Sequence, residues 1–86
     1  MMSGTAKSRL IYELIMECRR FGNSQPDGTC RLDASERDLA ARAGLTRETV
    51  SREMSKLKKL GWVTISGKGI FIHDIKDLER ALGSEL

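Results

Sequence analysis

The sequence contains few of the residues from which catalytic and metal sites are usually built. Among 86 residues there is one histidine, His73, and there are two cysteines, Cys18 and Cys30. A single histidine without identifiable partners makes neither a hydrolytic triad nor a metal site. The spacing of the cysteines matches neither paired zinc ligands nor the framework of a disulfide-rich secreted domain. We therefore predict two free, buried thiols and a protein that is not an enzyme.

The chain also lacks a long apolar run and a strong excess of charge. No stretch approaches the roughly 18 consecutive apolar residues of a membrane span, and the first residues do not resemble a signal peptide. We therefore predict a cytoplasmic protein with no membrane contact. Hydrophobic residues make up 40% of the sequence and the net charge is +3. This composition fits one globular domain, residues 1–86.

The first third of the chain predicts a helix, a loop and a strand. Apolar residues recur at three- and four-residue spacing over residues 6–21, which indicates a helix with one buried face. Turn-forming residues, including the single proline, predict a loop over 23–28. Residues 29–32 then resemble a short strand.

The centre of the chain predicts two consecutive helices joined by a tight turn. Ser35 precedes Asp38 by three residues, the spacing of a helix-starting capping box. Gly44 can take a left-handed conformation and end that helix. Thr46 is an N-cap for the next helix, which we predict over residues 47–60.

The C-terminal part predicts a hairpin and a last helix. Residues 62–65 and 70–72 are β-prone and are separated by a glycine-rich turn, and Asp74 can cap the final helix. The predicted fold is α+β, a winged helix-turn-helix with a three-helix core, a β-hairpin wing and a short C-terminal helix. We expect the helix-turn-helix at about 35–60 and the wing at about 62–73.

Positive charge is concentrated in one part of the sequence. Residues 42–68 contain seven basic and two acidic side chains, a net charge of +5, whereas the rest of the chain carries −2. On a helical wheel, the helix 47–60 places its apolar side chains on one side and its polar side chains opposite. The polar side would meet a polyanion. The apolar set is Val50, Met54, Leu57 and Leu60.

The residue types on the polar side suit the edges of base pairs. An arginine can donate two hydrogen bonds to guanine, and a carboxylate can accept one from cytosine N4. Arg47, Glu48 and Arg52 supply these groups near the start of the helix, the part that reaches base edges in a major groove. Ser51 is small enough to permit close approach. The alternative is that Glu48 and Arg52 form only an exposed pair one helical turn apart.

Two motifs carry a family resemblance. The segment Leu45–Arg52, with the sequence Leu-Thr-Arg-Glu-Thr-Val-Ser-Arg, and the segment Ile65–Gly69, with Ile-Ser-Gly-Lys-Gly, resemble the C-terminal DNA-binding domain of the cyclic-AMP receptor protein and Fnr family. The resemblance covers nearly the whole chain. It implies sequence-specific binding of double-stranded DNA by a bacterial transcription regulator, with the helix 47–60 in the major groove of a TGA-containing half-site.

The resemblance also implies two sets of DNA contacts. One branch of the family reads bases with residues that match Arg47, Glu48 and Arg52, and the other with residues that match Glu48, Ser51 and Arg52. The combined base-reading set is Arg47, Glu48, Ser51 and Arg52. The set that matches phosphate-contacting positions is Ser35, Thr46, Thr49 and Lys68.

Further partners and two departures follow from the same resemblance. The loop 26–28 matches a surface that touches RNA polymerase in some members, and the full-length regulator is expected to be a homodimer. An effector would bind a separate sensor domain, so no cofactor is expected within these residues. Two residues depart from the family pattern. Glu36 is an acidic residue at the start of the helix that crosses the DNA backbone. Glu53 stands where the motif usually has an apolar residue.

Two alternatives to DNA reading stay open at this point. The same winged-helix fold could serve as a protein-interaction module without sequence-specific DNA binding. Cys18 and Cys30 could instead form a redox-sensing thiol site, which native-state thiol reactivity would reveal.

Overall fold

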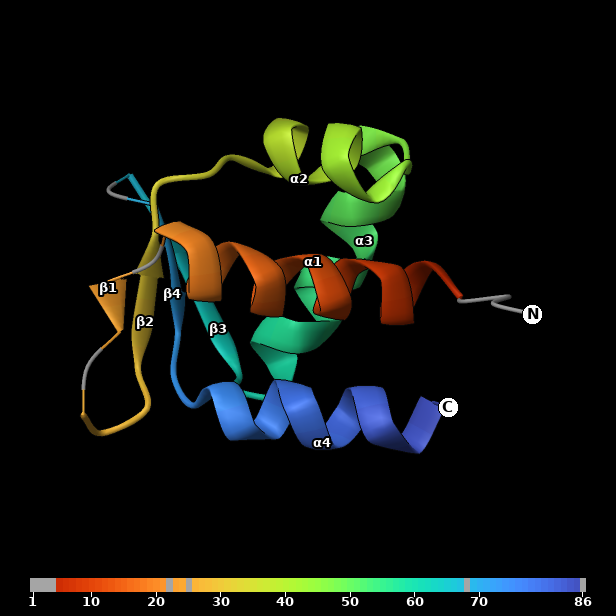
Figure 1. Ribbon diagram of the computed structural model, residues 1–86. Coiled ribbons are helices and arrows are strands. Elements are labelled where there is room, and N and C mark those ends of the chain that lie inside the picture. Colours follow the sequence, from red (N-terminus) through yellow and green to blue (C-terminus); the bar gives the residue numbers. More distant parts are fainter. Residues whose placement is uncertain (1–4, 22, 25, 68, 86) are drawn as a thin grey trace.

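In the part of the chain that the structure describes, four helices and four short strands follow one another in the order that the sequence predicts, except that the sequence does not predict the strand at residues 23–24. The computed structural model describes residues 5–21, 23–24, 26–67 and 69–85 (Figure 1). It confirms the α+β winged-helix class. The elements are α1 (Ala6–Phe21), β1 (Asn23–Ser24), β2 (Cys30–Leu32), α2 (Glu36–Ala43), α3 (Arg47–Lys59), β3 (Val63–Ser66), β4 (Gly69–Ile72) and α4 (Ile75–Glu85).

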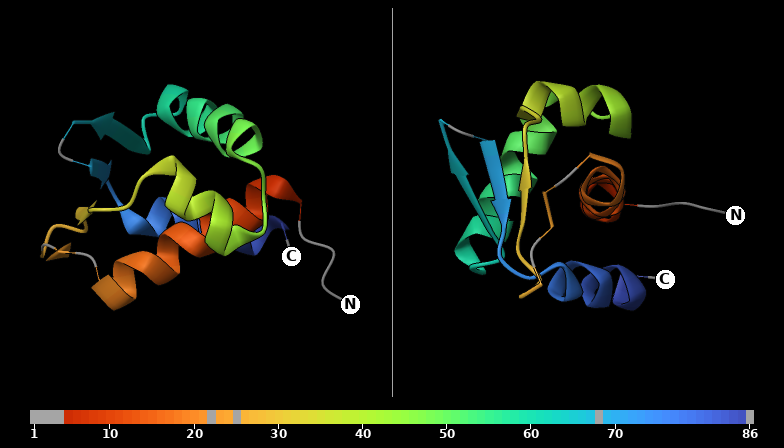
Figure 2. Two further views of the ribbon diagram at one scale, coloured as in Figure 1. Left: turned by 90° about the horizontal axis from the view of Figure 1, so that it is seen from above. Right: turned by 60° about the vertical axis from the view of Figure 1, so that its left-hand side comes forward.

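Helix α1 forms the centre of the hydrophobic core. Its residues Leu10, Ile11 and Leu14 have no exposed surface. The helix contacts α2, α3 and α4 as well as β2, and α4 runs antiparallel beside it (Figures 1 and 2). The core therefore packs against the inner sides of α2 and α3 and leaves their outer sides exposed.

Among the described helices, none combines the length and apolar character that crossing a bilayer requires.

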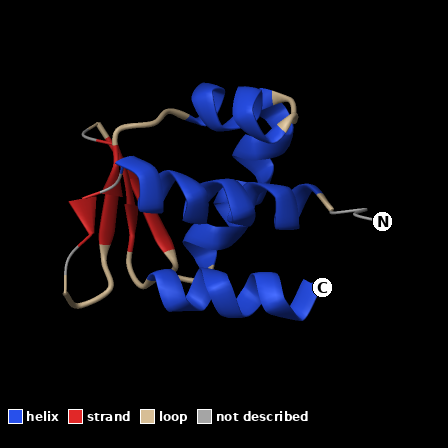
Figure 3. Ribbon diagram, in the orientation of Figure 1, coloured by secondary structure: helices blue, strands red, loops and turns tan. Residues whose placement is uncertain are grey.

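The strands gather at one side of the domain in a single antiparallel sheet with the order β1-β2-β4-β3 (Figure 3). The predicted loop over residues 23–28 is wrong at its start, because Asn23 pairs with Arg31 and Ser24 with Cys30. This edge strand forms through backbone pairing with β2 and not through its own residue types. The wing, β3 and β4, is thus part of a larger sheet that includes the segment before α2.

Gly69 is the position where the wing approaches the rest of the sheet most closely. Its φ is +127°, and a Cβ at this position would collide with the backbone carbonyl oxygen of Leu32. Only glycine fits both constraints. We expect Gly69→Ala to lower the free energy of unfolding by at least about 1–3 kcal/mol, measured by urea denaturation. Gly67→Ala is the matched control, because a Cβ there would have no neighbouring atom within 4 Å; equal losses for both variants would contradict the prediction.

The two cysteines form a disulfide, which corrects the prediction of free thiols. Cys18 on α1 and Cys30 on β2 are bonded, with their Cα atoms 6.4 Å apart. The prediction of burial is confirmed, since each residue is only 2% exposed. Sequence spacing could not show that α1 and β2 place these residues face to face. In this disulfide-bonded form neither cysteine has a reactive free thiol, so the redox-sensing alternative applies only to the reduced protein.

Candidate nucleic-acid interface

A tight turn between α2 and α3 sets the angle of the helix pair. Gly44 ends α2 with φ +70° and ψ +35°, and its N–H donates to the carbonyl of Ala40. Thr46 then starts α3, accepting a hydrogen bond from the Thr49 N–H at 3.1 Å. Leu45, between the two caps, packs against the core. The predicted stop and start signals are therefore confirmed, and they produce the helix-turn-helix.

The start of α2 carries the predicted capping box. The Asp38 N–H donates to Ser35 Oγ at 3.2 Å, and the Ser35 N–H donates to Asp38 Oδ2 at 3.0 Å. The Ser35 N–H, and after it the Ser35 hydroxyl, hold the pKa of Asp38 below its ordinary value, so this carboxylate is ionised at neutral pH. Ser35 Oγ also donates to Asp38 Oδ2 at 3.0 Å. Its hydroxyl would have to give up that bond to donate to a phosphate.

Helix α3 separates a buried face from a polar outer face. Val50, Met54 and Leu57 are at most 1% exposed. The outer face carries the four residues predicted to read bases, and all four are exposed: Arg47, Glu48, Ser51 and Arg52. The prediction that Leu60 lies in the core is wrong. Leu60 is 54% exposed, because α3 ends at Lys59 and Leu60 occupies the C-cap.

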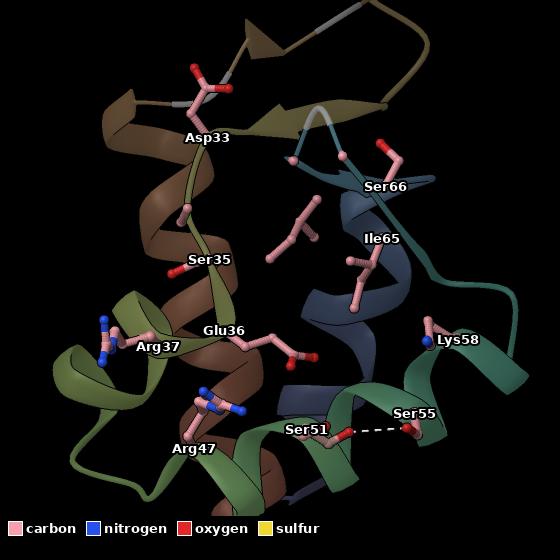
Figure 4. A pocket seen from close by; sticks show the side chains of 14 residues that line it. Asp33, Ser35, Glu36, Arg37, Arg47, Ser51, Ser55, Lys58, Ile65 and Ser66 are labelled. Atoms are coloured by element: carbon pink, nitrogen blue, oxygen red, sulfur yellow. Dashed lines mark hydrogen bonds between the residues drawn. The ribbon is translucent and has the colours of Figure 1, made fainter.

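The outer face of α3 borders two hollows that share several residues. The smaller, of about 510 Å³, is lined only by polar side chains, which are Glu36, Arg47, Glu48, Ser51, Arg52 and Ser55. The larger, of about 720 Å³, lies between the start of α2, the face of α3 and the wing (Figure 4). The fold thus brings the predicted base-reading residues onto one concave surface.

Three of the four residues predicted to touch phosphates lie at the starts of the two helices of the helix-turn-helix. Ser35 caps α2, whereas Thr46 and Thr49 lie in the first turn of α3. Thr46 Oγ1 donates to Thr49 Oγ1 at 2.8 Å, which leaves the hydroxyl hydrogen of Thr49 available to an external acceptor. Lys68, the predicted contact at the wing tip, lies outside the described residues.

Two of the seven basic residues in the segment 42–68 form ion pairs within the domain. Arg42 Nη1 lies 2.6 Å from Oε1 of Glu17, whose side chain is 4% exposed. Lys56 Nζ lies 3.2 Å from Glu53 Oε2, and this pairing gives the unexpected Glu53 a partner. Glu17 lies on α1, so no local pattern could reveal it. In the described part of the chain, no ion pair involves the bases left on α3: Arg47, Arg52, Lys58 and Lys59.

The proposed exposed pair between Glu48 and Arg52 does not form. Within the described residues neither side chain has an ion-pair partner, although they lie one helical turn apart. Both groups are therefore available to an external ligand. This observation disfavours the alternative in which Glu48 serves only as an intrahelical partner.

Sequence reasoning missed how close the start of α2 comes to this surface. Glu36 lines both hollows, and Ser55 does so as well. The helical wheel placed Ser55 on the polar side of α3, so that residue could have been included. The position of Glu36 depends on the crossing of two helices, which periodicity within one helix does not specify.

A helix pair joined by a tight turn, a second helix with an exposed polar face and an adjacent β-hairpin define a winged helix-turn-helix domain. Residues 8–81 match the model of the Crp-like helix-turn-helix domain. The chain belongs to this family of transcription-regulator DNA-binding domains, which bind double-stranded DNA.

The relatives of the chain are transcription regulators. The chain is 31% identical over 74 residues to a CRP-like cAMP-activated global transcriptional regulator of Mycobacterium tuberculosis, covering 84% of this chain and 33% of the relative. It is 38% identical over 69 residues to a global nitrogen regulator of Synechocystis, covering 78% and 30% respectively. The chain therefore spans about a third of the length of the curated relatives it matches.

A solved structure shows the same fold over the whole domain. A CRP/FNR-family transcriptional regulator from Thermus thermophilus superposes with a TM-score of 0.84 and 25% sequence identity. The match covers 98% of this chain and 43% of that protein. The match extends over α4, so the short C-terminal helix is part of the shared fold.

Proposed function

We propose that this domain binds a TGA-containing half-site in double-stranded DNA, with α3 in the major groove. The observation that carries the proposal is the separation of faces on α3. Arg47, Glu48, Ser51 and Arg52 line one polar hollow, while Val50, Met54 and Leu57 of the same helix are buried. The helix can therefore present its reading groups without losing its packing.

The chemistry of these side chains supports reading of bases. Each arginine can donate two hydrogen bonds to guanine O6 and N7, and Glu48 can accept one from cytosine N4. By the family resemblance, Glu48 and Arg52 lie over the G·A step of the half-site. An acidic side chain does not help bulk affinity for a polyanion, so the value of Glu48 lies in discrimination between bases.

Phosphate contacts would hold the helix in register. We assign them to Ser35, Thr46, Thr49 and Lys68, with the Thr49 hydroxyl and the amides at the start of α3 available to an anionic oxygen. Lys58 lines the hollow between α3 and the wing and can add a charge contact. Such contacts fix position and carry no sequence information.

The domain is proposed to work within a larger regulator that acts in the cytoplasm as a homodimer on an inverted repeat. Its effector would bind outside these residues.

RNA polymerase is the proposed partner of the loop 26–28. Asp27 in this loop is exposed, and it is held in a turn by the Thr29 N–H at 3.0 Å and the Thr29 hydroxyl at 2.8 Å. These hydrogen bonds lower the pKa of Asp27, so the loop presents a negative charge at neutral pH.

Selection of bound sequences from random duplex DNA tests the proposal. We expect a recovered motif that contains TGA, and binding to that motif that weakens steeply with salt. The slope of log K against log salt should be about −0.9 for each phosphate neutralised. Lys76→Ala is a suitable control and should leave binding unchanged, because Lys76 is an exposed base on α4, which lies on the opposite side of the domain from the start of α3 (Figure 1).

Two outcomes would contradict the proposal. Recovery of no motif, together with indifference to salt, would favour a winged-helix protein-interaction module. Recovery of a motif without TGA would retain DNA reading and overturn the half-site.

A further inference from the structure

Glu36 is an acidic residue that lies among the proposed DNA-reading side chains. It is the first residue of α2, and it shares both hollows with Arg47, Ser51 and Ser55. Figure 4 shows its carboxylate directed into the larger hollow, on the side where Arg47 and Ser51 lie. Within the described part of the chain, this half-buried side chain has neither a hydrogen-bond nor an ion-pair partner.

A carboxylate on a surface that faces DNA has two different effects. It repels phosphates, which weakens binding to every duplex regardless of sequence. Beside an arginine, it can also accept hydrogen bonds from the guanidinium. A guanidinium has five N–H donors, and guanine uses only two of them, so a neighbouring carboxylate can accept from the others.

Arg47 is the arginine that such a carboxylate would affect. It is exposed, and no ion pair fixes its direction within the described residues. An unrestrained arginine at the edge of a major groove can donate to phosphate oxygens, which are the same in every sequence. A partner on the protein side would restrict that choice.

We propose that Glu36 is a positioning residue that sets sequence specificity through Arg47. When α3 enters the major groove, the Glu36 carboxylate accepts a hydrogen bond from the Arg47 guanidinium and directs it towards the base edge and away from the phosphates. Non-specific DNA gains nothing from this pairing, whereas the repulsion of phosphates acts on every duplex alike. Discrimination therefore rises because the pairing favours only the correct duplex. This inference rests on the proposed function of α3.

The test compares Glu36→Gln with the unchanged protein on three duplexes. The first duplex is the selected half-site, and the third is an unrelated sequence. The second is the half-site altered at one base pair, the one at which Arg47→Ala abolishes the preference; we call it the Arg47 base pair. Glutamine retains the shape of the side chain and removes its charge. We expect affinity for the unrelated duplex to rise several-fold, while preference at the Arg47 base pair falls about tenfold, because the neutral amide oxygen of glutamine accepts a weaker hydrogen bond from the guanidinium than the carboxylate does.

Two controls separate positioning from simple repulsion. Asp33→Asn removes the same charge from the same larger hollow, but Asp33 lies far from Arg47 (Figure 4) and pairs with Arg31 at 3.7 Å. This variant should change affinity for all three duplexes equally. In the Arg47→Ala background, Glu36→Gln should leave base preference unaltered, since the group it positions is gone. Thermal melting establishes that each variant is folded.

The outcomes are distinct. Equal tightening on all three duplexes after Glu36→Gln, as for Asp33→Asn, would mean that Glu36 only repels phosphate and would overturn the inference. No change on any duplex would also overturn it. Absence of sequence preference in the unchanged protein would instead overturn the proposed function of α3.

Discussion

Replacing Arg47 and Arg52 together by alanine is expected to remove most of the preference for the half-site while the domain stays folded. Each bidentate contact to guanine contributes about 1–3 kcal/mol of discrimination, or about 5- to 150-fold in affinity. Both side chains are exposed and unpaired in the described structure, so their removal costs no internal ion pair. Fluorescence anisotropy with specific and unrelated duplexes measures the ratio, and the single variants show how far the two contributions add.

Lys58→Ala is the matched comparison for the arginine pair. Lys58 lines the hollow between α3 and the wing and carries the same charge as each arginine. Removing a phosphate-binding group here should weaken binding to all sequences equally and reduce the salt slope by about 0.9. If the arginine double variant behaved in this same uniform way, the two arginines would bind phosphates and would not read bases.

The second large effect is expected on breaking the Cys18–Cys30 disulfide. The bridge closes a loop over a sequence separation of 12 residues. In the chain-entropy view, a loop of about this length stabilises the folded state by about 3 kcal/mol, because it restricts the unfolded chain. Urea denaturation with and without reductant should show this difference. Cytosolic thiol pools favour the dithiol form, so the reduced protein is the relevant comparison under the proposed cytoplasmic location.

A variant with both cysteines changed to alanine controls for the reductant. Its stability should equal that of the reduced protein to within the cost of two small buried cavities, and reductant should not change it further. Titration of two reactive thiols in the native, oxidant-treated protein would contradict the pairing. Equal stability of the oxidised and reduced forms would show that the bridge does not stabilise the fold.

The parts of the fold that sequence could predict depend on neighbours along the chain. Ser35 and Asp38 are three residues apart, and Thr46 and Thr49 likewise, so each cap is encoded within one helical turn. The division of α3 into buried and polar faces follows from its periodicity alone. The exposure of the residues proposed to read bases could be predicted because they share one face of one helix.

The parts that escaped prediction join residues that are distant in sequence. The disulfide brings α1 to β2, and Arg42 reaches back to Glu17 on α1. The pairing of β1 with β2 similarly depends on backbone contacts and not on residue preference. Glu36 reaches the two hollows beside α3 through the crossing of α2 and α3. Such contacts depend on tertiary packing, which no local pattern records.

The pairing of β2 with β4 has a consequence for the shape of DNA that the domain accepts. Leu32 pairs with Ile70 and also approaches Gly69, and only two residues separate it from Ser35 at the start of α2. The wing and the start of α2 therefore cannot move apart independently. In the proposed docking the wing and the start of α2 both contact the DNA backbone, at a fixed separation. Base steps that bend easily or change the groove width should therefore influence selection at base pairs that no side chain touches.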